Sequence, residues 1–130
     1  MQGAILMKKI FVISLSVSLL IVISFVIKSM ASDYKKIQLV MELYEKEDFG
    51  GRKIVIAVDT PDLEEYCFND KTNSLKVFRG PNYMGGAQVK VFSGKDYKGG
   101  YIELTADEEV KNLEKDKGFG STISSVKFPY

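Results

Sequence analysis

Carboxylates are the residues of this chain best suited to acid–base chemistry, and two short stretches each bring three of them together. Each stretch could supply the pair of carboxylates that general acid–base hydrolysis requires. The chain has no histidine, no tryptophan and one cysteine, so the commonest general base and most transition-metal ligands are missing. We therefore expect solvated acidic faces, and a protein that is not an enzyme. The two stretches comprise Asp62, Glu64 and Glu65, and Asp107, Glu108 and Glu109.

The single thiol belongs to Cys67, which lies between Tyr66 and Phe68. A lone cysteine cannot form a disulfide within the chain. The fold must therefore be held by its core alone or with help from another group, such as a bound metal. The flanking aromatic residues favour a small, buried, apolar role for Cys67. A reactive thiol, or one that pairs with another molecule, is the alternative that the sequence leaves open.

Two polar loops offer a set of neutral oxygen atoms. The first reads NDKTNS over residues 69–74 and the second GSTISS over residues 120–125, and each runs into a short apolar segment. Asn, Asp and Ser favour tight turns because their side chains bond to nearby backbone groups. A solvated turn is the simplest interpretation of either loop taken by itself.

The elements that would position these loops are short strands. Beyond residue 37 the apolar residues follow a period of two, and glycine turns separate the apolar runs. This pattern is typical of an all-β chain that folds as an antiparallel sandwich. The charged segment 106–117 has room for no more than a helical turn. The predicted strands cover residues 37–44, 53–58, 74–79, 87–92, 101–105 and 125–128.

A hairpin sequence occurs twice, as YEKEDFGG over residues 44–51 and FSGKDYKGG over residues 92–100. The strands and polar loops that follow also align, so the chain is an internal duplication. Each copy is predicted to form a Greek key of four strands, and the third strand of the first copy is expected near residues 64–68. A ring can fold over the turn only where the backbone beneath lacks a Cβ and can take a positive φ. The repeated motif consists of Tyr44, Phe49 and Gly51, and of Phe92, Tyr97 and Gly99.

The N-terminal segment has the composition of an export signal. Lys8 and Lys9 precede a mostly apolar run, Ile10–Ile27, and small residues at Ser29 and Ala31 suit cleavage after Ala31. The run is also long enough to cross a bilayer as a helix, so an uncleaved anchor is the alternative. Either outcome makes the protein secreted, cell-surface or periplasmic.

These features divide the chain into a hydrophobic signal helix at 1–31, a linker at 32–36 and one folded domain at 37–130. The two Greek keys are expected at about 37–80 and 87–130. With 18 Lys and Arg against 17 Asp and Glu, the chain has no charge excess that would attract nucleic acid. Membrane contact is expected only through an uncleaved N-terminal segment, and no protein partner is indicated.

The duplicated aromatic–glycine motif, with a polar loop before each final strand, resembles the signature of the βγ-crystallin superfamily. The resemblance covers nearly the whole chain beyond the signal. Microbial members of this family are typically calcium-binding domains whose loops follow the pattern [N/D]-[N/D]-x-x-[S/T]-S. The resemblance implies that two such loops are shared crosswise between two calcium sites.

Transferred to this chain, the resemblance implies one site built from the Ser124 hydroxyl and the Lys71 and Glu45 carbonyl oxygens. Asn69 and Asp70 would be supporting residues of the loop at 69–74. Such ligands suit calcium, a hard cation that accepts neutral oxygen atoms, and the small number of full charges implies modest affinity. The ligands of the other site would be the Asn73 side chain and the Thr122 and Ser93 carbonyl oxygens.

Both loops depart from the family pattern. Asn73 stands where Ser or Thr is expected, and Gly120 and Ser121 replace the two Asn or Asp residues of the second loop. We therefore expect one or two calcium ions, with one site degraded. Two other functions remain open: a secreted protease inhibitor of the same fold, for which one cysteine is few, and a surface adhesive or carbohydrate-binding module.

Overall fold

The computed structural model describes residues 37–130, which belong to one compact unit. The predicted signal helix at 1–31 and the linker at 32–36 lie outside the described residues. Within residues 37–130, no helix is long and apolar enough to cross a membrane.

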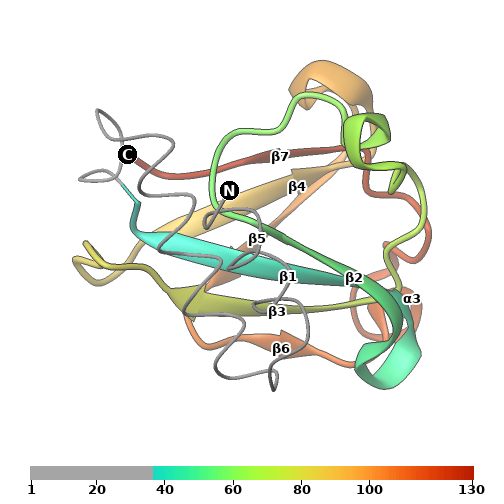
Figure 1. Cartoon of the computed structure of the whole chain (residues 1–130), viewed down its shortest axis with the longest axis horizontal. Coiled ribbons are helices and arrows are strands. Elements are labelled where there is room, and N and C mark those ends of the chain that lie inside the picture. Colours follow the sequence, from blue (N-terminus) through green and yellow to red (C-terminus); the bar gives the residue numbers. More distant parts are fainter. Residues whose placement is uncertain (1–36) are drawn as a thin grey trace, which may run out of the picture. The chain divides into compact units, whose positions relative to one another are not determined.

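The first sheet has four antiparallel strands in the order β2-β1-β3-β6 (Figure 1). Its central strand β1 (Leu39–Lys46) pairs with β2 (Gly50–Ile56) on one side and with β3 (Ser74–Arg79) on the other. Strand β6 (Glu109–Val110) is short and adds to the free side of β3. Three of these strands therefore come from the first Greek key and one from the second.

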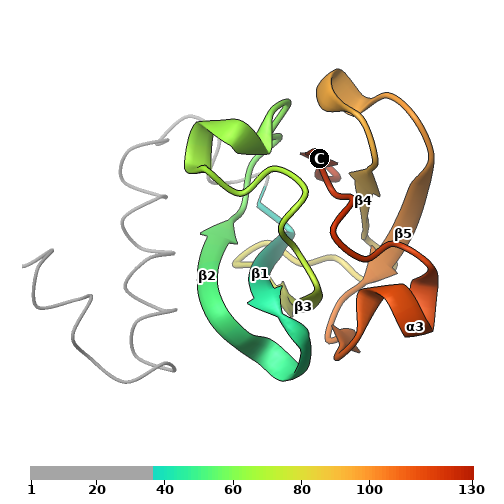
Figure 2. The same cartoon turned by 90° about the vertical axis from the view of Figure 1, so that its right-hand side faces the viewer.

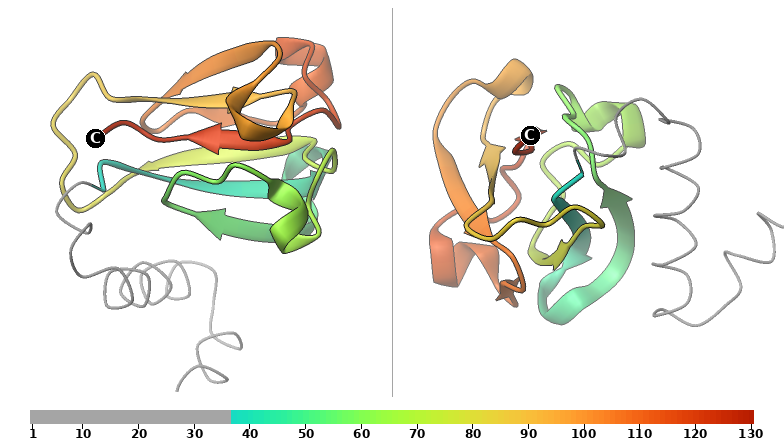
Figure 3. Two further views of the ribbon diagram at one scale, coloured as in Figure 1. Left: turned by 90° about the horizontal axis from the view of Figure 1, so that it is seen from above. Right: turned by 90° about the vertical axis from the view of Figure 1, so that its left-hand side faces the viewer.

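The second sheet has the order β5-β4-β7 and repeats the arrangement of the first. Strand β4 (Gln88–Phe92) is central, between β5 (Tyr101–Thr105) and β7 (Ser125–Lys127). Figures 2 and 3 show the two sheets as separate layers that face each other. The predicted all-β antiparallel sandwich is confirmed.

The two Greek keys exchange their third segments. Strand β6 of the second key pairs with β3 of the first, and Thr60 of the first key forms an isolated bridge with Val126 in β7 of the second. Two backbone hydrogen bonds of 2.9 Å join Thr60 and Val126. Each sheet is thus completed by residues from the other half of the chain.

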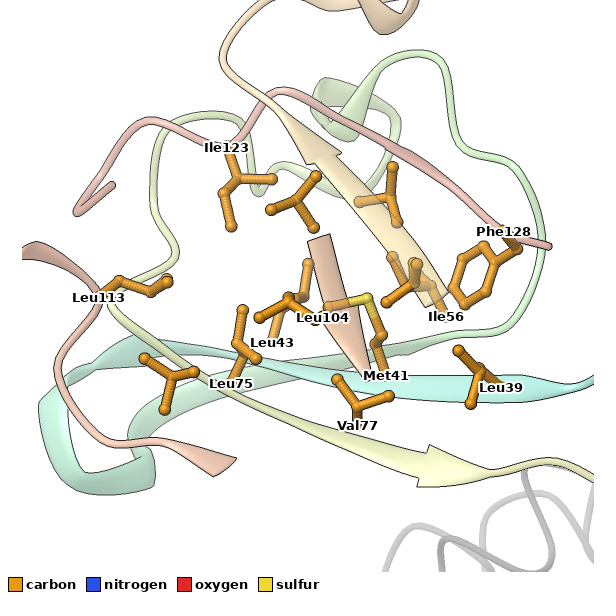
Figure 4. Close-up of a cluster of buried hydrophobic side chains, with 14 of the residues drawn as sticks. Leu39, Met41, Leu43, Ile56, Leu75, Val77, Leu104, Leu113, Ile123 and Phe128 are labelled. Atoms are coloured by element: carbon orange, nitrogen blue, oxygen red, sulfur yellow. The ribbon is translucent and has the colours of Figure 1, made fainter. Parts of the chain in front are cut away.

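Alternating residues of the strands fill the space between the sheets. Leu39, Met41 and Leu43 of β1 are fully buried, as are Val89 and Val91 of β4. Figure 4 shows the labelled β1 side chains gathered with those of other strands, including Leu75, Val77 and Leu104. Residues 39–44 are all buried, but only every second one belongs to the core cluster, and this alternation is the pattern from which the strands were predicted.

The predicted third strand near residues 64–68 is wrong. Residues Leu63–Tyr66 form a 3-10 helix, η3, because the Asp62 carboxylate accepts a hydrogen bond from the Glu64 backbone N–H and starts a turn. The second key has an equivalent helix, α3 (Leu113–Lys117), which Asn112 caps in the same way. The helical turn expected within residues 106–117 is confirmed.

Candidate metal centre

The two aromatic hairpins fold back on themselves with the same geometry. The Tyr44 and Phe49 ring centroids lie 5.4 Å apart, and those of Phe92 and Tyr97 lie 5.9 Å apart. The turns, η2 (Glu47–Phe49) and η4 (Lys95–Tyr97), each contain two non-glycine residues with positive φ. Gly99 has a φ of +83°, and a Cβ there would lie 2.4 Å from the Ser93 hydroxyl oxygen.

Two buried serines hold these hairpins, and sequence reasoning gave them no role. The Ser74 hydroxyl donates to the Lys46 carbonyl at 2.5 Å and accepts from the Phe49 N–H at 3.0 Å. The Ser125 hydroxyl bridges the Gly94 carbonyl and the Tyr97 N–H at 2.6 and 3.0 Å. Both serines have an exposed fraction of 0%. The available signal was their shared position, the last residue of each polar loop.

The backbone of each polar loop is attached both to its own hairpin and to the other loop. The Asn73 N–H donates to the Tyr44 carbonyl at 2.9 Å, and the Ser124 N–H donates to the Phe92 carbonyl at 2.8 Å. Between the loops, Asp70 N–H donates to Ile123 and Ser121 N–H donates to Thr72, each at 3.0 Å. Both loops lie at the end of the sandwich that carries α3 (Figure 1).

The loop side chains also pair across the duplication. The Ser121 hydroxyl donates to Asn73 Oδ1 at 3.0 Å, and the Ser124 hydroxyl donates to Asp70 Oδ1 at 3.0 Å. In each pair, the fifth residue of one loop meets the second residue of the other. The structure therefore brings the two predicted loops together crosswise.

Two of the predicted carbonyl ligands converge on one point. Asn73 Nδ2 lies 2.8 Å from the Glu45 carbonyl oxygen and 3.5 Å from the Lys71 carbonyl oxygen. In the other half, the Ser124 hydroxyl lies 3.4 Å from the Thr122 carbonyl oxygen. Ser93 follows β4 directly, as the counterpart of Glu45. The observed neighbours of Asn73 and Ser124 thus include carbonyls of their own Greek keys, a grouping that differs from the one implied by the resemblance.

Comparison with known proteins agrees with this duplicated geometry. A family model described as Beta/Gamma crystallin matches residues 40–84, which lie mostly in the first key. A βγ-crystallin from Ciona intestinalis is 26% identical, covers 68% of this chain and 98% of its own, and superposes with a TM-score of 0.57. The chain is therefore similar to βγ-crystallins in the sequence of its first key and in its fold.

Microbial βγ-crystallins share the fold. An archaeal βγ-crystallin is 24% identical, covers 70% of this chain and 98% of its own, and has a TM-score of 0.57. A double mutant of a βγ-crystallin domain from Clostridium beijerinckii is 21% identical, with coverages of 69% and 96% and a TM-score of 0.52. A search of curated proteins gave no match.

The donor set of the two polar loops fits a hard cation. Two buried oxygen atoms of the first loop, Asn69 Oδ1 and Thr72 Oγ1, have no hydrogen-bond partner among residues 37–130. The same residues contain no cluster of three or more His, Cys, Asp or Glu side chains. Carbonyl, amide and hydroxyl oxygens therefore dominate the loops, and such atoms are ligands that calcium accepts.

The ring at the start of the first hairpin is held by a buried polar network. The Tyr44 hydroxyl donates to Glu42 at 2.6 Å, and Lys53 forms an ion pair with the same carboxylate at 2.7 Å. Burial raises the pKa of the Tyr44 phenol, and the bond to Glu42 raises it further. Burial also raises the pKa of Tyr97, the second ring of the other hairpin. Both phenols therefore stay neutral at physiological pH.

The two acidic stretches of residues 37–130 are engaged in turns and ion pairs. Asp62 caps η3, and Asp107 forms an ion pair with Arg79 at 2.8 Å. Burial opposes ionisation of Glu108, but hydrogen bonds from Thr105 and Lys117 outweigh it, so the pKa of Glu108 falls below its usual range. These hydrogen bonds and ion pairs stabilise the turns in which the carboxylates lie.

The expectation that Cys67 is buried is wrong. Cys67 is exposed and ends η3 with a φ of +54°, at the position where Gly118 ends α3 with a φ of +66°. A left-handed residue at a helix end turns the chain away from the helix axis, as glycine commonly does there. The thiol of this domain therefore faces solvent.

We expect the Cys67 thiol to react in the folded protein, because its side chain is accessible without unfolding. Titration with a chromogenic disulfide reagent in native buffer should label one thiol per chain, as it does in denaturant. The control is the Cys67→Ser variant, which should not react. Labelling that required denaturant would contradict the exposed position.

Proposed function

We propose that this protein is an exported, calcium-binding βγ-crystallin domain with a structural or stress-related role. The observation that carries the proposal is the convergence of oxygen atoms where the two loops meet. The Ser124 hydroxyl lies 3.0 Å from Asp70 Oδ1 and 3.4 Å from the Thr122 carbonyl oxygen. The Glu45 and Lys71 carbonyl oxygens both lie near Asn73 Nδ2, at 2.8 and 3.5 Å. Calcium would supply a positive centre for these oxygen atoms.

The arrangement of the loops supports a linking role for the ion. Asp70 and Ser121, the second residues of the two loops, each contact the fifth residue of the opposite loop. Ligands drawn from this interface would join the Greek keys to each other. The low charge of the donor set favours modest affinity, which suits the higher calcium concentration outside cells.

The export half of the proposal is supported by the sequence alone. Lys8 and Lys9 precede the apolar run Ile10–Ile27, and small residues precede Ser32. An exported domain with a single thiol cannot use an internal disulfide. A bound ion would provide an alternative form of stabilisation.

Calcium is expected to stabilise the folded domain by mass action. An ion that binds only the native state adds about 2.7 kcal/mol when its concentration is about 100 times Kd, and half of that gain would raise the Tm of a domain of this size by roughly 5 °C or more. Thermal unfolding should be followed by circular dichroism in millimolar calcium, in chelator and in equal magnesium. A Tm that is the same in calcium and in chelator would exclude the proposed function.

A further inference from the structure

The Asn73 side chain bridges three groups at the loop interface. Its amide nitrogen donates towards the Glu45 and Lys71 carbonyl oxygens, at 2.8 and 3.5 Å, while its amide oxygen accepts from the Ser121 hydroxyl at 3.0 Å. An amide nitrogen carries two N–H donors, so one side chain can meet both carbonyls. A serine or threonine hydroxyl, the group expected at this position, has one donor.

We infer that the Asn73 amide substitutes for a cation at the Glu45–Lys71 carbonyl pair. When no ion is bound, the amide closes the pair by donating hydrogen bonds to both oxygen atoms. The inference rests on the proposed calcium function and adds which side of the loop interface takes the ion first. Two carbonyl dipoles that point at one place repel each other unless a positive group lies between them. The partly positive N–H groups of Asn73 fill this role without an ion.

The opposite half of the interface is not closed in this way. The Ser124 hydroxyl has one proton, and it lies 3.0 Å from the Asp70 carboxylate and 3.4 Å from the Thr122 carbonyl. One proton cannot satisfy both acceptors, and the carboxylate adds a full negative charge. Calcium therefore binds first on the Asp70–Ser124 side. From the sequence, the missing Asn or Asp residues at Gly120 and Ser121 had indicated erosion of the second loop instead.

Entry of calcium at the Glu45–Lys71 pair requires the amide to move. Rotation of the Asn73 amide by half a turn would direct Oδ1 towards the ion and Nδ2 towards the Ser121 hydroxyl, which can accept as well as donate. The closed pair therefore opposes the binding of a second ion. The size of this barrier depends on the hydrogen bonds of the amide nitrogen.

The sharpest test replaces that nitrogen by oxygen at constant shape, in Asn73→Asp. In chelator, a carboxylate oxygen would face the two carbonyls, and we expect the Tm to fall by roughly 5–15 °C. Asn112→Asp is the matched control: it makes the same change of charge, but the Asn112 bond to the Lys115 N–H uses the oxygen, which aspartate keeps. The Tm of this control should stay within about 2 °C of the parent, since Asn and Asp cap helices equally well.

The effect of calcium on the Tm of Asn73→Asp distinguishes the possible outcomes. We expect millimolar calcium to restore most of the Tm lost in Asn73→Asp, and isothermal titration to give one ion for the parent and two for the variant. A variant no less stable in chelator than Asn112→Asp would overturn the inference, whether or not calcium binds. A loss that calcium does not restore would overturn the idea that the amide stands in for a cation. A parent without any calcium response would instead remove the proposed function, leaving the chelator result to decide the role of Asn73.

Discussion

Replacing Phe68 by alanine is expected to lower the free energy of unfolding by about 3–5 kcal/mol, because it leaves a cavity in a closely packed core. Phe68 is fully buried, and its N–H donates to the Leu63 carbonyl at 3.0 Å, directly before the first polar loop. The Arg52 guanidinium also lies 4.9 Å from the centroid of its ring. The change would therefore loosen both the core and the start of the loop at residues 69–74. Chemical denaturation with urea measures the loss.

Tyr66→Ala provides the control for this substitution. Tyr66 lies in the same short helix region but is 44% exposed, so its removal should cost less than about 1 kcal/mol. Equal losses for the two variants would contradict the placement of the Phe68 ring between the sheets. A calcium-induced rise in Tm should also be smaller in Phe68→Ala than in Tyr66→Ala, since only Phe68 anchors the loop.

The second large effect is expected from the hairpin serines. Ser74→Ala removes a buried hydroxyl that joins the Lys46 carbonyl to the Phe49 N–H, and it leaves both groups without this partner. We expect a loss of about 2–3 kcal/mol in the free energy of unfolding, and a similar loss for Ser125→Ala in the second key. Denaturation in chelator isolates this effect from calcium binding.

An exposed hydroxyl serves as the comparison. Thr105→Val keeps the shape of the side chain and removes an exposed hydroxyl whose bond to Glu108 is long, at 3.4 Å, while the Thr105 N–H keeps its bond to the same carboxylate. This change should alter the free energy of unfolding by less than about 0.5 kcal/mol. If Ser74→Ala were as mild as Thr105→Val, the serine would not hold the hairpin. If only one of the two serine variants were destabilised, the two keys would differ in a way that their geometry does not indicate.

Local patterns were sufficient to predict most of the fold. The alternation of apolar residues located β3 and β5 with the bounds that the structure has, at Ser74–Arg79 and Tyr101–Thr105. The repeated rings and glycines indicated the duplication because each hairpin requires a residue with positive φ, at Gly51 and at Gly99. The all-β class follows from these signals without any long-range information.

The segment between the hairpin and the final strand of each key could not be predicted in the same way. Residues 64–68 carry aromatic side chains that favour a strand, but the carboxylate of Asp62 initiates a helical turn. The exposure of Cys67 follows from its left-handed backbone, a conformation that side-chain type alone does not indicate for cysteine.

The candidate site could likewise be predicted only in part. The family resemblance implied that the polar loops at residues 69–74 and 120–125 meet, and hydrogen bonds join them in the structure. The sequence could not show that the Asn73 amide reaches the Glu45 and Lys71 carbonyls, because that depends on the length of one side chain across a tertiary contact. The roles of Ser74 and Ser125 were hidden for the same reason, since their partners lie 28 and 31 residues away.

The exchange of segments between the Greek keys also affects how the two halves of the chain can exist. Strand β6 covers the free side of β3, and Thr60 joins β7, so neither half has a complete sheet of its own. A half expressed alone would expose an unpaired strand edge, which recruits strands from other molecules and promotes aggregation. A protease cut in the connection between β3 and β4 would leave two fragments that still hold each other. Each half of the chain therefore depends on the other to complete its sheet.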